Sequence, residues 1–109
     1  MVEYMNKITF EQFTHVMSFD INKQNACIEA NFCLDDCLSY QDSWLGKLAD
    51  SETGKDIYWF GLADDGSQAY SFESFEKFVD AKVFDGKTIK EIWDLISFFF
   101  IDTFGSYRQ

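Results

Sequence analysis

Residues 26–34 alternate between apolar and more polar side chains, and this alternation constrains the fold more than any other feature of the sequence. The apolar series is Ala26, Ile28, Ala30, Phe32 and Leu34, and the other series is Cys27, Glu29, Asn31 and Cys33. Since successive side chains of a strand point to opposite faces of a sheet, the pattern predicts a strand that covers a core with one face. For residues 34–48, leucines at helical spacing leave a helix open as an alternative.

Further strands are predicted in the middle of the chain. Residues 56–63 are rich in aromatic and β-branched side chains, and turn-forming residues lie on both sides of them. The dipeptide Asp65-Gly66 is typical of a tight turn, which would pair this strand with one at residues 68–72. A loop around Gly54 would pair the same strand with one near residues 44–49.

The first helix is predicted close to the N-terminus. Thr9 and Gln12 have the spacing of a capping box, in which each side chain bonds to the backbone of the other residue. The residues that follow at helical spacing, and that form one apolar stripe, are Phe10, Phe13, Val16 and Met17.

Two further helices are predicted in the last third of the chain, one at residues 74–81 and one after the turn at Asp85-Gly86. Thr88 and Glu91 form a second capping box at the start of the latter. The predicted fold class is therefore α+β, with a small antiparallel sheet of three to four strands, an N-terminal helix and two C-terminal helices. With 109 residues, the chain has room for a single compact acidic domain spanning residues 1–109.

The acidic charge of the chain limits what it can bind. Nineteen acidic and nine basic side chains give a formal net charge of -10, on a chain that is 47% hydrophobic. The hydrophobic content excludes a disordered acidic tail, and the charge argues against direct nucleic-acid binding, which needs a stripe of lysines and arginines. Residues 1–55 hold nine acids and four bases, and residues 56–109 hold ten and five, so the charge belongs to the whole domain.

The sequence carries no signal for export or membrane insertion. Residues 1–7 lack the basic and apolar regions of a secretory signal, and the apolar run at residues 98–101 is far shorter than a membrane span. Three cysteines, an odd number, argue against a secreted disulfide framework. We therefore expect a cytoplasmic protein that has no contact with a membrane.

The three cysteines and the one histidine indicate a possible metal site. The donors of a Cys3His zinc site are present in His15, Cys27, Cys33 and Cys37, so a structural zinc ion is the predicted cofactor. A straight strand from Cys27 to Cys33 spans roughly 20 Å, so one metal ion requires a bulge or turn between them. The alternative is that the cysteines are small core residues and that His15 lies on a helix surface.

No catalytic motif accompanies these residues. His15 is the only histidine, no G-x-S-x-G sequence is present, and the six glycines form no phosphate-binding loop. A catalytic metal would need a general base, for which Glu29 and Asp36 are the candidates. We therefore expect a protein without enzymatic activity.

Acidic side chains in two stretches that contain no base form the predicted partner-binding surface. Its residues are Glu29, Asp35, Asp36, Asp42, Asp64, Asp65, Glu73 and Glu76. Carboxylates on a rigid surface attract a basic partner and speed the encounter, although acidity also serves solubility alone. The candidate aromatic anchors among these acids are Tyr40, Trp44, Tyr70 and Tyr107, with the alternative that each is a core or half-buried residue.

In its size, its acidity and its two base-free stretches, the chain resembles the small acidic phage-encoded inhibitors of CRISPR-Cas nucleases, the anti-CRISPR proteins. The resemblance covers the overall character of the chain and assigns no residue by position, because those proteins share no common motif or fold. It implies a non-catalytic protein that binds a basic surface of a CRISPR effector such as Cas9, in the host cytoplasm, and blocks access of guide or target DNA. The alternative is an acidic immunity or housekeeping interaction module that does not compete with nucleic acid.

Overall fold

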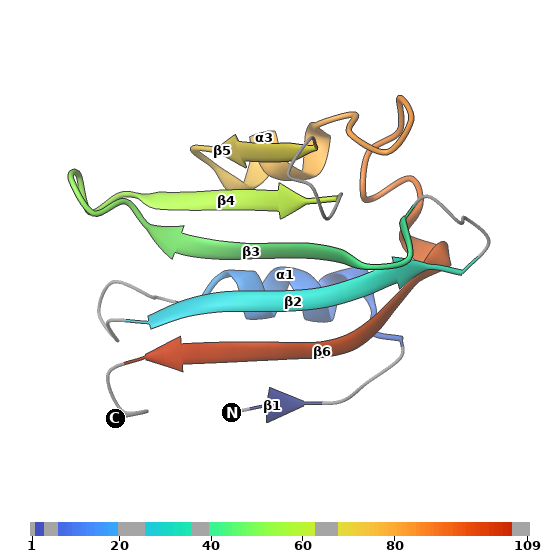
Figure 1. Ribbon diagram of the computed structural model, residues 1–109, viewed down its shortest axis with the longest axis horizontal. Helices are drawn as coiled ribbons and strands as arrows, with labels where there is room; N and C mark the ends of the chain where they lie inside the picture. The colour runs from blue at the N-terminus through green and yellow to red at the C-terminus, as the bar shows by residue number, and fades with distance from the viewer. Residues whose placement is uncertain (1, 4–6, 20–25, 36–39, 63–67, 106–109) are drawn as a thin grey trace.

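The strands form one antiparallel sheet, and the helices pack against it. The computed structural model describes residues 2–3, 7–19, 26–35, 40–62 and 68–105. The elements in chain order are β1 (Val2–Glu3), α1 (Phe10–Met17), β2 (Ala26–Leu34), β3 (Ser43–Ala49), β4 (Asp56–Gly61), β5 (Ala69–Phe72), α3 (Phe75–Asp80), the 3-10 helix η2 (Trp93–Leu95) and β6 (Ile96–Gly105). The order in the sheet is β1-β6-β2-β3-β4-β5, so the last strand of the chain lies between β1 and β2 (Figure 1).

The N-terminal helix α1 begins where the sequence predicts it. The Thr9 side chain accepts a hydrogen bond from the backbone N–H of Gln12 (3.0 Å), and the Gln12 side chain accepts one from the backbone N–H of Thr9 (2.9 Å). Phe13 and Met17 are the buried side chains of the helix. Neither α1 nor any other helix among the described residues has the length and apolar character that crossing a membrane requires.

The strand predicted from the alternation at residues 26–34 is confirmed as β2. The side chains on one face are buried, namely Ile28, Ala30, Phe32 and Leu34. Those on the other face are half-buried, namely Cys27, Glu29, Asn31 and Cys33. β2 therefore faces the core with its apolar series and turns its cysteines and its acid away from the core.

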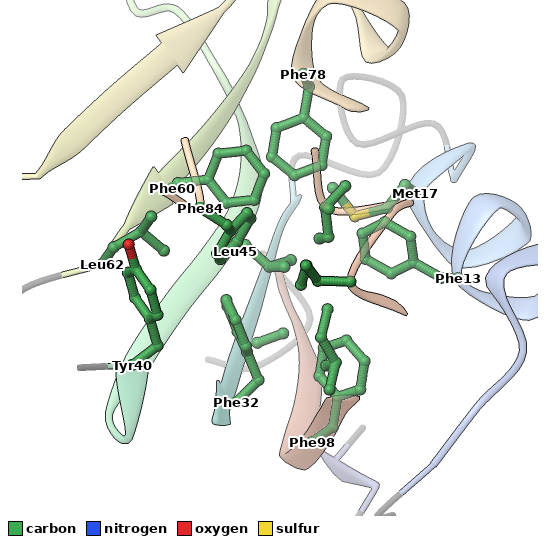
Figure 2. Close-up of a cluster of buried hydrophobic side chains, with 14 of the residues drawn as sticks. Phe13, Met17, Phe32, Tyr40, Leu45, Phe60, Leu62, Phe78, Phe84 and Phe98 are labelled. Carbon is green, nitrogen blue, oxygen red and sulfur yellow. The ribbon is translucent and has the colours of Figure 1, made fainter. Parts of the chain in front are cut away.

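The core consists largely of aromatic rings between the sheet and the helices. The Phe60 ring of β4 stacks on the Phe78 ring of α3, with centroids 4.2 Å apart and an interplanar angle of 12°. Phe13 of α1 lies 6.4 Å from Phe78 and 6.2 Å from Phe98 of β6. These rings converge in one cluster (Figure 2), so α1 and α3 cover the same face of the sheet. Each fully buried ring of this size contributes about 1.5–3 kcal/mol.

Lys47 attaches the end of α1 to the middle of the sheet. Its side chain is 3% exposed, and its ammonium donates hydrogen bonds of 2.9 Å each to the carbonyl oxygens of Met17 and Phe19. The Asp56 carboxylate lies 3.5 Å from the same ammonium, and the Tyr58 ring centroid lies 5.3 Å from it. Because the last carbonyls of a helix have no partner within the helix, a cation at this place satisfies and stabilises that end.

The sheet has more strands than the three to four that the sequence predicts, and one predicted helix is absent. The box of Thr88 and Glu91 forms, with bonds of 2.9 and 3.1 Å, but the chain then makes turns and the short helix η2 instead of a second C-terminal helix. It continues into β6, which pairs with β2 from Ile96 to Gly105. The pairing of this Phe-rich and Ile-rich strand outweighs the helical spacing of the apolar residues before it.

The remaining predictions for the fold are partly confirmed and partly wrong. The helix left open for residues 34–48 is wrong, because β3 occupies this region and lies between β2 and β4. The pairing of the strand at residues 56–63, observed as β4, with β3 and β5 is confirmed, whereas the turn at Asp65-Gly66 lies outside the described residues. The turn at Asp85-Gly86 is confirmed: both residues have positive φ angles, 54° and 83°, between the bridged residues Phe84 and Lys87.

We predict that Lys47→Met destabilises the chain by about 2 kcal/mol, because two buried carbonyls at the end of α1 lose their donor while the apolar stem is retained. The free energy of unfolding, measured in urea, tests this. The matched control is Lys55→Met in the exposed loop between β3 and β4, which should change stability by less than about 0.5 kcal/mol. Equal effects of the two substitutions would show that Lys47 does not anchor the helix.

Candidate functional site

The face of the sheet opposite the helices is the candidate site. In Figure 1 α1 lies behind the strands, and the core contacts place α3 on that same side. We call the opposite surface the open face. By strand alternation and register it includes Cys27, Glu29, Asn31, Cys33, Trp44, Gly46, Leu48, Ile57, Trp59, Gly61, Ala69, Ser71, Ser97, Phe100 and Asp102. No helix among the described residues packs on it.

The open face is apolar at several positions where a solvated sheet would be polar. Leu48 is 40% exposed, and Ile57, Trp59 and Phe100 are half-buried. Trp44 and Phe100 contact each other edge to face, with centroids 5.5 Å apart, across Asn31, which is the register partner of both. Apolar side chains gathered on one sheet face, one of them exposed and the others half-buried, make this surface the candidate interaction site.

Trp59 lies over Gly46, its register partner on β3. A Cβ atom at position 46 would lie 2.7 and 2.8 Å from two atoms of the Trp59 indole and 2.2 Å from the carbonyl oxygen of Ile28. Glycine is therefore required here, because the indole occupies the space of a side chain. The next residue of the same row, on β2, is Glu29, which pairs with Gly46 on one side and with Asp102 of β6 on the other.

The open face is acidic because of how the charged residues of the strands are oriented. The strands contain the acids Glu3, Glu29, Asp56 and Asp102 and a single base, Lys47. Lys47 points to the core side, whereas Glu29 and Asp102 share the open face. The described lysines that follow β5 belong to the segment packed on the covered face, namely Lys77, Lys82, Lys87 and Lys90. Asp102 is only 4% exposed, so Glu29 is the strand carboxylate that the open face presents, and no base of the described strands lies on this face.

The predicted acidic surface is not continuous. Glu29 lies on the open face, and Asp42 is exposed beside it, where it accepts a hydrogen bond of 3.0 Å from the Asn31 amide. Glu73 and Glu76 are exposed next to and within α3, on the side of the covered face. Asp36, Asp64 and Asp65 lie outside the described residues.

Asp35 is engaged within the molecule. Its carboxylate accepts a hydrogen bond from the Lys7 ammonium and another from the Ser97 hydroxyl, each 2.6 Å long. The bonds from Lys7 and then from Ser97 hold the pKa of Asp35 below its ordinary value, against the smaller opposing effect of burial. Asp35 therefore joins the end of β2 to the N-terminal segment and to β6 rather than presenting a free charge.

The described zinc candidates do not come together. His15 is exposed on α1, on the covered face, whereas Cys27 and Cys33 belong to the open face. In the part of the chain that the structure describes, no three or more His, Cys, Asp or Glu side chains form a group suited to a metal ion. Cys37 lies outside the described residues, so the structural zinc site stays a prediction.

The two described cysteines are not brought closer by a bulge. The irregularity between β2 and β6 places an extra residue, Phe99, on β6, while β2 continues straight from Cys27 to Cys33. Burial raises the pKa of the Cys33 thiol, the charge of Asp35 raises it further, and Lys7 lowers it in part. Because the thiolate is the form that binds metals and attacks electrophiles, Cys33 is not an activated cysteine.

The aromatic anchors expected from the sequence divide between core and surface. Trp44 lies on the open face as an anchor would. Tyr40 follows the alternative instead, because it is 3% exposed and packs against Phe84 in the core. Tyr70 is 36% exposed on the edge strand β5, and Tyr107 lies outside the described residues.

Four residues of the open face were not identified from the sequence, namely Gly46, Trp59, Phe100 and Asp102. A signal for them exists in β4, where both alternating series are apolar: Tyr58 and Phe60 face the core, and Ile57 and Trp59 face outward. A strand with apolar side chains on both faces is typical of a sheet that is covered on both sides.

A shallow pocket of about 450 Å³ lies between the start of α1 and η2. Its apolar walls include Phe10 and Trp93, and its polar groups already bond to one another or to the backbone, as in the box of Thr9 and Gln12. Lys7, at its rim, is bound to Asp35 and to the Asp94 carbonyl oxygen. This pocket therefore offers no set of groups for catalysis.

Comparison of the chain with known proteins gives no match to a family model, a curated protein or a solved structure.

We predict that Gly46→Ala destabilises the chain by about 1–3 kcal/mol and displaces the Trp59 indole, because the added methyl group overlaps both the ring and the Ile28 carbonyl. Urea denaturation and the emission spectrum of the tryptophans test this. The matched control is Gly61→Ala on the same face, where a Cβ would make contacts of 3.7 and 3.9 Å only. A Gly46→Ala variant as stable as Gly61→Ala would contradict the close approach of Trp59.

Proposed function

We propose that this chain is a non-catalytic protein-binding module whose open face docks on a basic surface of another protein. The observation that carries the proposal is the opposite character of the two sheet faces. One face is filled by helices and contains the only lysine of the strands, and the other combines Trp44, Trp59 and Phe100 with the carboxylate of half-buried Glu29. Aromatic side chains supply contact area, and carboxylates select a partner of opposite charge.

A different protein, rather than a second copy of the chain, is the proposed occupant of the open face. In a two-fold symmetric pair the same surface meets itself, so the surface that carries Glu29 in one copy would face that of the other. Each copy also carries a net charge of -10, which opposes self-association. A basic partner relieves both effects.

The partner class that we propose is a nucleic-acid-binding effector, whose cleft is basic because it neutralises phosphates. Binding there places the carboxylates of this chain where the phosphates of nucleic acid would lie, and so blocks access of guide or target DNA. The resemblance to anti-CRISPR proteins supports a CRISPR nuclease such as Cas9 as the first partner to test. The net charge favours rapid encounter with such a surface at low ionic strength.

Binding to a nuclease free of nucleic acid, measured at several salt concentrations, tests the proposal. We predict that Glu29→Lys weakens binding at least about tenfold, because it reverses a charge inside the interface. The matched control is Glu76→Lys, which makes the same change of net charge on exposed α3 and should weaken binding less than about threefold.

Two outcomes would overturn the proposal. Equal weakening by Glu29→Lys and Glu76→Lys would show that net charge, and not the open face, governs binding. Failure to bind any member of a panel of Cas9-type and other basic nucleases would exclude this class of partner.

A further inference from the structure

We infer that the row of Glu29, Gly46 and Trp59 on the open face is the subsite for one arginine side chain of the partner. The inference rests on the proposed function and adds to it the chemical group that the face recognises. The three residues are direct register neighbours on β2, β3 and β4. Neighbouring strands lie about 4.8 Å apart, so the row places a carboxylate and an indole within the reach of one long cationic side chain.

The missing side chain at position 46 shapes this subsite. The Trp59 indole lies over Gly46, as its closeness to the Cβ position shows, and it remains half-buried rather than enclosed. The ring thus covers the residue that is the register neighbour of Glu29. A larger residue at position 46 would displace the indole from this position.

Glu29 provides the charge that the subsite needs. Among the described residues the Glu29 carboxylate makes no hydrogen bond and no ion pair, in contrast to Asp35 and Asp42. Its register partner on β6, Asp102, is buried, so Glu29 is the carboxylate of this row that a partner can reach.

The combination favours arginine over lysine. A guanidinium is planar and can stack on an aromatic face while it donates two parallel hydrogen bonds to a carboxylate. Trp59 offers the aromatic surface and Glu29 the carboxylate. In the row across the strands, Gly46 is the one residue between them. A lysine ammonium is a compact, strongly hydrated charge and gains less from the indole.

The neighbouring aromatic pair is a less suitable site for a cation. Trp44 and Phe100 contact each other across Asn31, and the Asn31 amide already donates to the Asp42 carboxylate and to the Ser43 carbonyl oxygen. This row therefore provides apolar contact area beside the subsite rather than charge recognition.

The subsite is tested by nuclear magnetic resonance of the tryptophan indole N–H groups in the full chain. The probes are hexa-arginine, hexa-lysine and the uncharged hexa-citrulline. We expect hexa-arginine to shift the Trp59 signal and to bind at least about fivefold more tightly than hexa-lysine, with no response to hexa-citrulline. Trp93 is the internal control, because its indole N–H donates to the Ile8 carbonyl oxygen on the covered side.

Variants complete the experiment. Glu29→Gln, which keeps the shape of the side chain, should weaken hexa-arginine binding at least about fivefold, and Asp42→Asn should change it less than twofold. An unchanged Trp93 signal shows that each variant is folded.

The outcomes separate the inference from the proposed function. Equal binding of hexa-arginine and hexa-lysine with a shift of Trp59 would overturn the arginine subsite and leave the basic-partner proposal standing. Peptide binding that shifts Trp93 as much as Trp59, or that Glu29→Gln does not weaken, would overturn the subsite. Unchanged nuclease binding by the Glu29→Lys variant would overturn the proposed function itself.

Discussion

The stack of Phe60 on Phe78, with ring centroids 4.2 Å apart, holds the helical layer on one face of the sheet. Phe13 extends the same cluster to α1 and to Phe98 of β6, so strands distant in the sequence share one set of rings. A sheet with apolar side chains on both faces, but with helices packed on one, leaves a second apolar surface without a layer of its own. The other properties of the molecule follow from this asymmetry.

Lys47 extends the asymmetry to the charges. It is the only base in the six strands, and its bonds to the Met17 carbonyl at the end of α1 and to the Phe19 carbonyl just beyond it direct it to the covered side. The same contact fixes the helix and removes positive charge from the opposite face. Glu29 is therefore left as the accessible ionic group that the strands contribute to a surface formed largely by aromatic, aliphatic and small residues, while Asp102 on the same face is buried. The stability of the helix end and the proposed recognition of a basic partner thus depend on the direction in which β3 points its side chains.

Local patterns predicted much of the fold and little of the site. The box of Thr9 and Gln12 and the alternation of β2 were sufficient for a helix and a strand, because their bonds and periodicity are local. β6 was missed because its position depends on pairing with β2, more than sixty residues earlier in the chain. The site was missed for a similar reason: only the register of β3 and β4 shows that Trp59 lies over Gly46. Acids in loops carry no alternation, so their faces could not be assigned from the sequence.

Methyl cross-saturation from a bound nuclease tests most directly that the open face is the docking surface. Leu45 and Leu48 belong to the same strand but point to opposite faces, being fully buried and 40% exposed respectively. We predict that Leu48 and Ile57 lose intensity in the complex while Leu45 and Val83 retain it. Loss confined to Val79 and Val83, on the helical side, would place the partner on the covered side and contradict the account.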